Sequence, residues 1–165
     1  NSLLDSRMVD KLYEASQAGV KIELIVRGIC VLIPGIPGVS DNITVRSLVG
    51  RFLEHSRVFW FNNGGREELY IGSADWMPRN LNDRVELMIP VKDTDCMHRI
   101  KNMVLKELAD NQKAHIMQSN GTWVKMIASE NKVCAQEYFQ KLAEQRSEQE
   151  KMTLKQKFEP YVPVK

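Results

Sequence analysis

Cysteine is scarce: Cys30, Cys96 and Cys134 are far apart among 165 residues, and no C-x-x-C pair is present. Zinc sites and disulfide frameworks need closer or paired spacing, so we expect reduced structural cysteines in a cytosolic protein. No apolar run approaches the length of a membrane span, and no signal-peptide pattern opens the chain. These absences favour a cytoplasmic location, with membrane association as an alternative.

Excess charge is also small, because 23 basic and 21 acidic residues leave a formal net charge of +2. That value does not indicate a nucleic-acid partner, so any functional positive charge must be local. The common phosphate-binding motifs are missing: there is no G-x-x-x-x-G-K-[ST] loop, no G-x-G-x-x-G before a helix and no kinase-type H-R-D. A chain that handles nucleotide phosphates without these loops must use another arrangement.

The length fits one domain, which we expect over residues 1–150, followed by a basic, solvated tail over residues 151–165. Asn1 is not a methionine and leads directly into a helical pattern. We therefore interpret the chain as a piece of a longer polypeptide.

Apolar residues at helical spacing from Leu4 to Ala15 predict a first helix, with Asn1 or Ser2 as its cap. Residues 20–26 alternate and then become fully apolar, as an inner strand does. A helix followed by a strand predicts an α/β layer. Further strands are expected over residues 44–48, 57–61, 69–71, 85–91, 114–118 and 122–126, and helices through residues 97–108 and 135–142.

Polar residues concentrate at the predicted strand ends, where open α/β sheets place their ligands. Arginine offers phosphate a bidentate set of donors, and a Gly-Ser pair adds backbone N–H groups and a hydroxyl. A histidine among them can accept a phosphoryl group or shuttle a proton. The cluster consists of Arg27, Arg51, His55, Arg57, Ser73, Asp75, Arg79, Asn82, Arg84 and Glu86.

Simpler interpretations of these residues stay open. A surface arginine is usually solvated, and a lone histidine is usually structural, as we expect for His98 and His115. Asp75 and Glu86 are either acid–base groups or ion-pair partners of the arginines at positions 79 and 84.

Three segments are distinctive: VRGICVLIPGIPG, VGRFLEHSR and GSADWMPRNLNDRVE. With the opening NSLLD they resemble the last catalytic domain of bacterial polyphosphate kinases of the first type over roughly the first ninety residues. The resemblance implies an α/β fold, namely a phospholipase D-like half with a mixed β-sheet flanked by helices.

The resemblance also implies an activity. These enzymes reversibly transfer the terminal phosphate of ATP to inorganic polyphosphate through a phosphohistidine, and they need Mg²⁺. The implied partners are ATP, ADP, polyphosphate, the remaining domains of the same polypeptide and further copies in a homo-oligomer. The phosphorylated histidine and the magnesium ligands are expected upstream, so we expect this chain to be inactive alone.

Specific residues follow from the resemblance. His55 matches a second histidine that contacts nucleotide and takes part in proton transfer, and Arg27 matches an ATP-contacting arginine. Arg84 and Glu86 are further site residues by position, and Ser73 with nearby N–H groups would complete a phosphate cradle.

His55-Ser56-Arg57 and Gly72-Ser73 occupy the places of the His-x-Lys and Gly-Ser of phospholipase D, with arginine replacing lysine. The PGIPG loop after Arg27 is expected to form one wall of the pocket. A phospholipase D-class phosphodiesterase is one alternative, but it would predict lysine at position 57 and no such loop. A non-catalytic anion-binding or assembly domain is the other.

Overall fold

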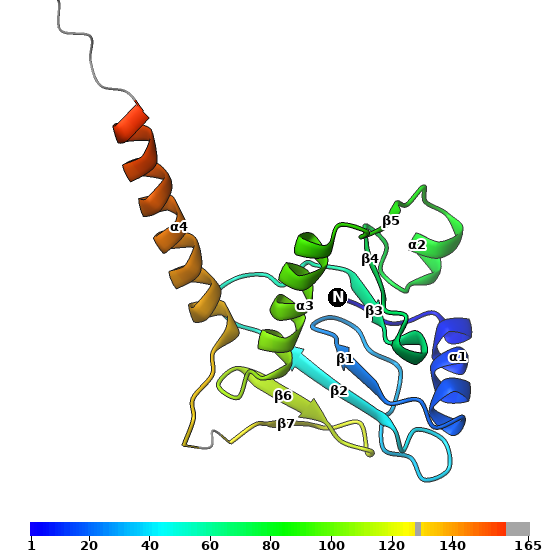
Figure 1. Ribbon diagram of the computed structural model, residues 1–165. Coiled ribbons are helices and arrows are strands. Elements are labelled where there is room, and N and C mark those ends of the chain that lie inside the picture. Colours follow the sequence, from blue (N-terminus) through cyan, green and yellow to red (C-terminus); the bar gives the residue numbers. More distant parts are fainter. Residues whose placement is uncertain (128–129, 158–165) are drawn as a thin grey trace, which may run out of the picture.

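The computed structural model of the chain describes residues 1–127 and 130–157, with side chains described up to residue 151 (Figure 1). Helices and strands alternate along these residues, which confirms the expected α/β class. In chain order the elements are α1 (Ser6–Gln17), β1 (Ile22–Ile25), β2 (Ile43–Leu48), β3 (Val58–Phe61), the 3₁₀ turn η1 (Asn63–Gly65), β4 (Glu68–Gly72), α2 (Pro78–Asn82), β5 (Met88–Pro90), α3 (Thr94–Leu108), β6 (Ala114–Met117), β7 (Trp123–Lys125) and α4 (Ala135–Lys157).

The strands form two sheets. The first has the order β1-β2-β6-β7 and is mixed, because β1 runs parallel to β2 whereas the other neighbours are antiparallel. The second has the order β3-β4-β5 and is antiparallel throughout. Both expected hairpins are confirmed, β3–β4 around η1 and β6–β7 around Gly121, whose φ of 80° suits glycine.

The main core lies between α1 and the first sheet. Val9 of α1 packs with Ile43 and Val45 of β2, Met117 of β6, and Leu32 from the loop after β1, and all five are buried. The apolar side chains of α1 recur at helical spacing, so they form one face of the helix, and this face covers the sheet.

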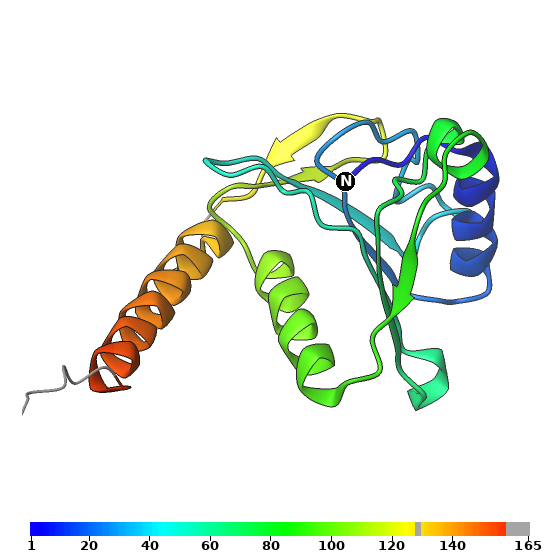
Figure 2. The ribbon, with the colours of Figure 1, turned by 90° about the horizontal axis from the view of Figure 1, so that it is seen from above.

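β1 was expected to be an inner strand, and this expectation is wrong: β1 is an edge strand of its sheet. Ile22 and Leu24 pack against the core under α1, whereas Glu23 and Ile25 line a cavity beneath α3, to which Leu24 also contributes. In Figure 2, α1 and α3 lie on opposite sides of β1 and β2. β1 is therefore apolar because helices cover both of its faces, although only one of its edges is paired with another strand. The sequence pattern does not distinguish this case from a strand with neighbours on both edges.

The N-terminal segment Asn1–Asp5 joins the two sheets. The Leu3 N–H donates to the carbonyl of Ile29 at 2.8 Å, and the Trp76 N–H donates to the carbonyl of Ser2 at 3.2 Å. The prediction that Asn1 or Ser2 caps α1 is wrong, because both residues belong to this extended segment. Asp5 is the cap, and its carboxylate accepts from the N–H of Met8.

One further expectation needs correction. The strand expected over residues 85–91 is limited to β5, because the preceding residues turn toward the polar cluster and leave Val85 and Leu87 exposed. α4 continues as far as Lys157, into the range expected as a basic tail, and projects away from the sheets (Figure 1). Residues 158–165 lie outside the described residues. Within the described ranges, no helix has the length and apolar character needed to cross a membrane.

Gly28 supplies the first prediction. A Cβ atom there would lie 2.4 Å from the Ser2 Oγ and 3.1 Å from the Asn1 carbonyl oxygen, so the N-terminal segment needs a glycine beside it. We expect Gly28→Ala to lower the free energy of unfolding by about 1–3 kcal/mol. Chemical denaturation of the 165-residue chain measures this loss.

A double-mutant cycle identifies the cause. Ser2→Ala removes the closer of the two obstructing atoms, so Ser2→Ala combined with Gly28→Ala should recover part of the loss. Strictly additive effects would show that the crowding against Ser2 is not the reason.

Candidate active site

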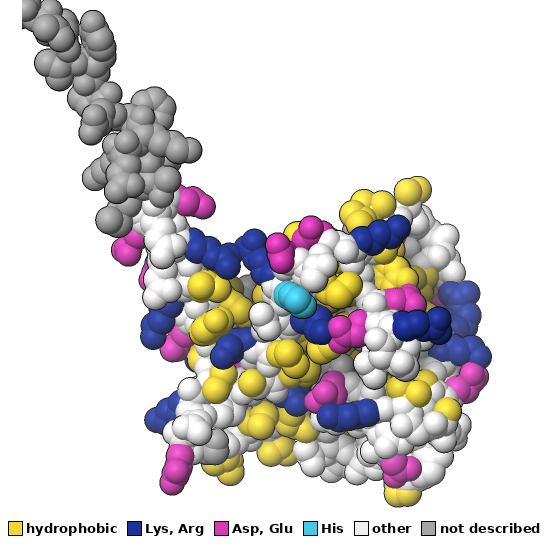
Figure 3. Space-filling model, viewed as in Figure 1, with side chains coloured by type: hydrophobic (Ala, Val, Ile, Leu, Met, Phe, Trp, Pro, Cys, Tyr) yellow, Lys and Arg dark blue, Asp and Glu magenta, His cyan; other side chains and the backbone are white. Residues whose placement is uncertain are grey.

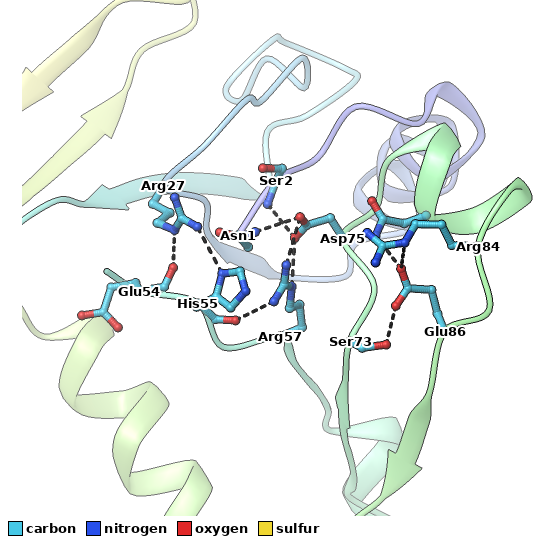
Figure 4. A network of polar contacts seen from close by, with 11 residues as sticks. Asn1, Ser2, Arg27, Glu54, His55, Arg57, Ser73, Asp75, Arg84 and Glu86 are labelled. Carbon is cyan, nitrogen blue, oxygen red and sulfur yellow. Dashed lines mark hydrogen bonds and ion pairs between the residues drawn. The ribbon is translucent and has the colours of Figure 1, made fainter. Parts of the chain in front are cut away.

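Polar side chains from separate parts of the chain meet where β1 ends, β3 begins and β4 ends (Figure 4). Several of them surround a cavity of about 410 Å³ on the surface. Most come from loops next to strand ends, as the sequence predicts for an α/β site. The cavity is lined by Asn1, His55, Arg57, Ser73, Asp75, Arg79, Asn80, Arg84 and Glu86.

Arg27 lies just beyond the carboxyl end of β1, as expected, and its guanidinium turns toward the loop before β3. Its Nε–H donates to the carbonyl oxygen of Glu54, and its Nη2 lies 3.3 Å from the Nδ1 of His55. Arg27 therefore holds both the backbone before His55 and the imidazole ring of His55 (Figure 4).

The contact with Arg27 defines which ring nitrogen of His55 can donate. A guanidinium has donors and no acceptor, so Nδ1 must accept, and the proton of the neutral ring lies on Nε2. His55 is exposed, and it lines the 410 Å³ cavity. The ring can thus present an Nε2–H donor to an anion in the cavity.

Arg57 does not extend into the cavity as a free cation. Its Nε and Nη2 donate to the two carboxylate oxygens of Asp75 at 3.1 and 3.2 Å, and its Nη1 donates to the carbonyl oxygen of His55 at 2.9 Å. The two side chains are only 13% and 11% exposed. Burial would raise the pKa of Asp75, but hydrogen bonds from Arg57 and Asn1 and the charge of Arg57 outweigh it and hold the pKa below its usual value.

Ser73 and Glu86 form a second cluster at the far side of the cavity. The Ser73 hydroxyl donates to the Glu86 carboxylate and accepts from the N–H of Leu87 at 3.0 Å. The N–H of Ser73 donates to the carbonyl of Leu87, so this group is occupied and does not extend a phosphate cradle here. The Ser73 hydroxyl, followed by the amide of Asn80, holds the pKa of Glu86 below its usual value.

Arg84 forms an ion pair with Glu86 and is much more accessible than Arg57. Its Nε lies 3.6 Å from the Glu86 carboxylate, and its side chain is 54% exposed. Figure 3 shows basic and acidic side chains intermingled over the face seen there, with no large patch of one sign. Positive charge for an anion is therefore local, as the small net charge predicts.

The structure thus brings together four of the five predicted site residues around one cavity, and Arg27 reaches it through His55. The ion-pair interpretation holds for Glu86 with Arg84, whereas Asp75 pairs with Arg57 instead of Arg79.

Other predicted residues lie elsewhere. Arg51 stacks on Phe52, with its guanidinium carbon 5.4 Å from the ring centroid, and Asn82 accepts a hydrogen bond from Arg7. The PGIPG loop does not form a wall of the cavity, contrary to expectation. It folds against α1, where Gln17 donates to the Gly38 carbonyl at 3.0 Å.

Asn1 and Asn80 are site residues that the sequence reasoning missed. The amide of Asn1 donates to Asp75 at 2.8 Å, and the amide of Asn80 donates to Glu86 at 2.6 Å. Asn80 lies inside the distinctive RNL segment, which was the available signal. For Asn1 nothing local indicated the site, because its partner is 74 residues away in sequence.

The described residues include no group of three or more histidine, cysteine, aspartate or glutamate side chains able to hold a metal ion. The two carboxylates that line the cavity, Asp75 and Glu86, are held by Arg57 and by Ser73 and Asn80, so no residue of this part is assigned to magnesium.

A second cavity, of about 170 Å³, lies between β1 and α3 directly behind Arg27. Glu107 of α3 lines it together with Glu54. Burial, and then the negative charge of Glu54, raise the pKa of Glu107 to about 7. This carboxyl therefore loses its proton near neutral pH, in a cavity that Arg27 also lines.

The raised pKa of Glu107 predicts a pH-dependent stability. A folded-state pKa above the unfolded value of 4.5 means that the contribution is fully present below about pH 4.5 and is lost as pH rises through about 7. Glu107→Gln should therefore raise the free energy of unfolding by about 1–2 kcal/mol at pH 8 and have little effect at pH 4.5.

Urea denaturation of the 165-residue chain at both pH values measures the difference. The exposed Glu148 of α4 provides the matched control, and Glu148→Gln should change stability equally little at both. An effect of Glu107→Gln that does not vary with pH would contradict the raised pKa.

Comparison with known proteins identifies the family. Residues 1–136 match the family model described as "Polyphosphate kinase C-terminal domain 2". The chain is 52% identical to polyphosphate kinase 1 of Chlorobaculum tepidum over 146 residues, which is 88% of this chain and 21% of that protein. It is 56% identical to polyphosphate kinase of Synechocystis over 124 residues, 75% of this chain and 17% of that protein.

A solved structure agrees. The crystal structure of polyphosphate kinase from Porphyromonas gingivalis superposes with a TM-score of 0.83 at 43% identity, covering 90% of this chain and 23% of that one. The match confirms the α/β architecture of a phospholipase D-like half. The chain spans about a fifth of the length of the curated relatives it matches. It belongs to the polyphosphate kinase family, as a C-terminal domain of that family.

Proposed function

We propose that this chain is the C-terminal catalytic part of an ATP:polyphosphate phosphotransferase and supplies one side of its nucleotide site. The observation that carries the proposal is the Arg27–His55 contact at 3.3 Å, which leaves an Nε2–H donor beside a cavity with further arginines. The names of the relatives supply the reaction class, and the resemblance supplies a phosphohistidine in an upstream domain.

In the proposed first step, an upstream histidine nitrogen attacks the γ-phosphorus of ATP. A nitrogen–phosphorus bond forms, the bond from phosphorus to the bridging oxygen breaks, and ADP leaves with the electron pair. Phosphoryl transfer depends mainly on positioning and on neutralising the charge of the phosphate oxygens. His55 donates a hydrogen bond from Nε2–H to a phosphate oxygen or to the leaving group and keeps its proton, and Arg27 keeps the ring in that tautomer.

Arg84 is proposed as a phosphate ligand, because it is half exposed and only loosely paired at 3.6 Å. Glu86 enters the site through Arg84 and Ser73, both of which it holds. A phosphate that draws Arg84 away would leave Glu86 bound to Ser73 and Asn80, so the carboxylate stays satisfied.

Substitution of His55 tests the proposal. In the full-length enzyme that contains this domain, His55→Ala should lower polyphosphate synthesis from labelled ATP on the order of a hundredfold or more. Because Nε2 is the proposed donor, His55→Gln, whose amide reaches the Nε2 position, should retain more activity than His55→Asn. An alanine variant that folds normally and stays within a few-fold of wild type would remove His55 from the mechanism.

Arg27 supplies an independent prediction. Loss of a charge-assisted, partly desolvated contact should cost about 2–4 kcal/mol of transition-state stabilisation, so Arg27→Ala should lower kcat/KM for ATP by tens- to several-hundred-fold. Arg27→Lys should be intermediate, since lysine keeps the charge but loses the planar fork.

Arg51→Ala is the matched control, because Arg51 is exposed and stacks only against its neighbour among the contacts described. It should remain within about twofold of wild type. If Arg27→Ala behaves like this control, Arg27 is only a surface charge.

A further inference from the structure

The loop that carries His55 has no regular backbone pairing of its own. Residues 49–57 belong to no helix or strand, and β3 begins only at Val58. A side chain on such a loop keeps its direction only if other groups hold the loop in place. Gln136 holds the N–H and the carbonyl of Phe52, and the Arg57 carbonyl accepts from the N–H of Gly72. Between these points Arg27 holds the imidazole and the carbonyl of Glu54, which leaves the carbonyl of His55 to be fixed.

Arg57 fixes that carbonyl. Its Nη1 donates to the His55 oxygen at 2.9 Å, while its Nε and Nη2 bind both oxygens of Asp75. Every nitrogen of the guanidinium is thereby engaged, and a carboxylate offsets its charge. This arrangement differs from a phosphate clamp, which needs a free edge of the guanidinium directed at the ligand.

Asp75 is held as completely as Arg57. Its Oδ2 also accepts from the Asn1 amide at 2.8 Å, and its Oδ1 accepts from the Ser2 N–H at 3.3 Å. The carboxylate thus ties three segments to one point: the N-terminal segment, the loop before β3 and the chain after β4 (Figure 4).

We propose that Arg57 and Asp75 form a positioning pair that sets the place of His55 through its backbone carbonyl, and that Arg57 is not itself a phosphate ligand. This inference rests on the proposed function of His55. It assigns to Arg57 a different task from the lysine whose place it occupies in the phospholipase D pattern.

Steady-state kinetics of the full-length enzyme separate the two roles. For a positioning pair, Arg57→Lys and Asp75→Asn should each lower kcat ten- to a hundredfold and leave KM for ATP within about twofold. Because the pair acts as one unit, kcat of the double variant should lie within about twofold of kcat of the less active single variant.

A phosphate clamp predicts the opposite pattern. Asp75→Asn would then release Arg57 and leave KM for ATP unchanged or lower, with kcat near wild type, whereas Arg57→Lys would raise KM. That result, or wild-type kinetics in both variants, would overturn the positioning role.

Lys101 provides the control for a merely structural effect. It forms an ion pair with Glu67 at 2.6 Å, with side chains 20% and 33% exposed, away from His55. Lys101→Gln should lower Tm by an amount comparable to the site variants while kcat stays at the wild-type value. A kcat loss in all variants that simply follows Tm would contradict the inference.

If either single variant fails to fold, Arg57→Gln combined with Asp75→Asn removes both charges together and keeps hydrogen-bonding groups on each side. Its kcat and KM then carry the same comparison. Wild type and His55→Ala are measured in parallel. Synthesis by wild type that His55→Ala abolishes, with normal kinetics in the pair variants, would refute only this inference. Absence of synthesis by wild type would refute the proposed function, and this inference with it.

Discussion

The arrangement of the site depends on the backbone hydrogen bonds of one short extended segment at the N-terminus. Leu3 pairs with the chain after β1, and the neighbouring residues pair with Trp76 after β4, so the segment lies between the two sheets. Arg27 comes after β1 of the first sheet, and Asp75 comes after β4 of the second sheet. The segment that connects the two sheets therefore helps to set the positions of both side chains relative to His55. The close approach at Gly28 is part of the same arrangement.

Two networks divide the work around His55. Arg27 contacts the imidazole ring of His55 and the carbonyl of Glu54 before it. Arg57 contacts the carbonyl of His55 itself. Ser73, Glu86 and Asn80 form a separate network that reaches the cavity through Arg84. The Arg57–Asp75 pair of the first network is largely buried and fully paired, whereas Arg84 of the second network is half exposed and lies 3.6 Å from the Glu86 carboxylate.

The sequence predicted the α/β class, both hairpins and the polar cluster, because periodicity, turn residues and strand-end polarity are local signals. It failed where the partner is distant. The cap of α1 is Asp5 and not Asn1 or Ser2, because the residues before Asp5 form backbone hydrogen bonds between the two sheets. The sequence of β1 is typical of an internal strand because helices cover both of its faces. The pairing of Arg57 with Asp75 had no local signal either, since 18 residues and a hairpin separate them.

The N-terminal segment also constrains how the domain is made. Leu3 finds its partners at Ile29 and Val31 early, but the partner of Ser2 at Asp75 lies 73 residues later, so on the ribosome the side of the segment that faces the second sheet stays unpaired until that stretch has been synthesised. At ordinary elongation rates this interval is roughly 4–15 s. Through that time the unpaired N–H and C=O groups form an open strand edge, which other nascent chains can pair with and which a chaperone can shield.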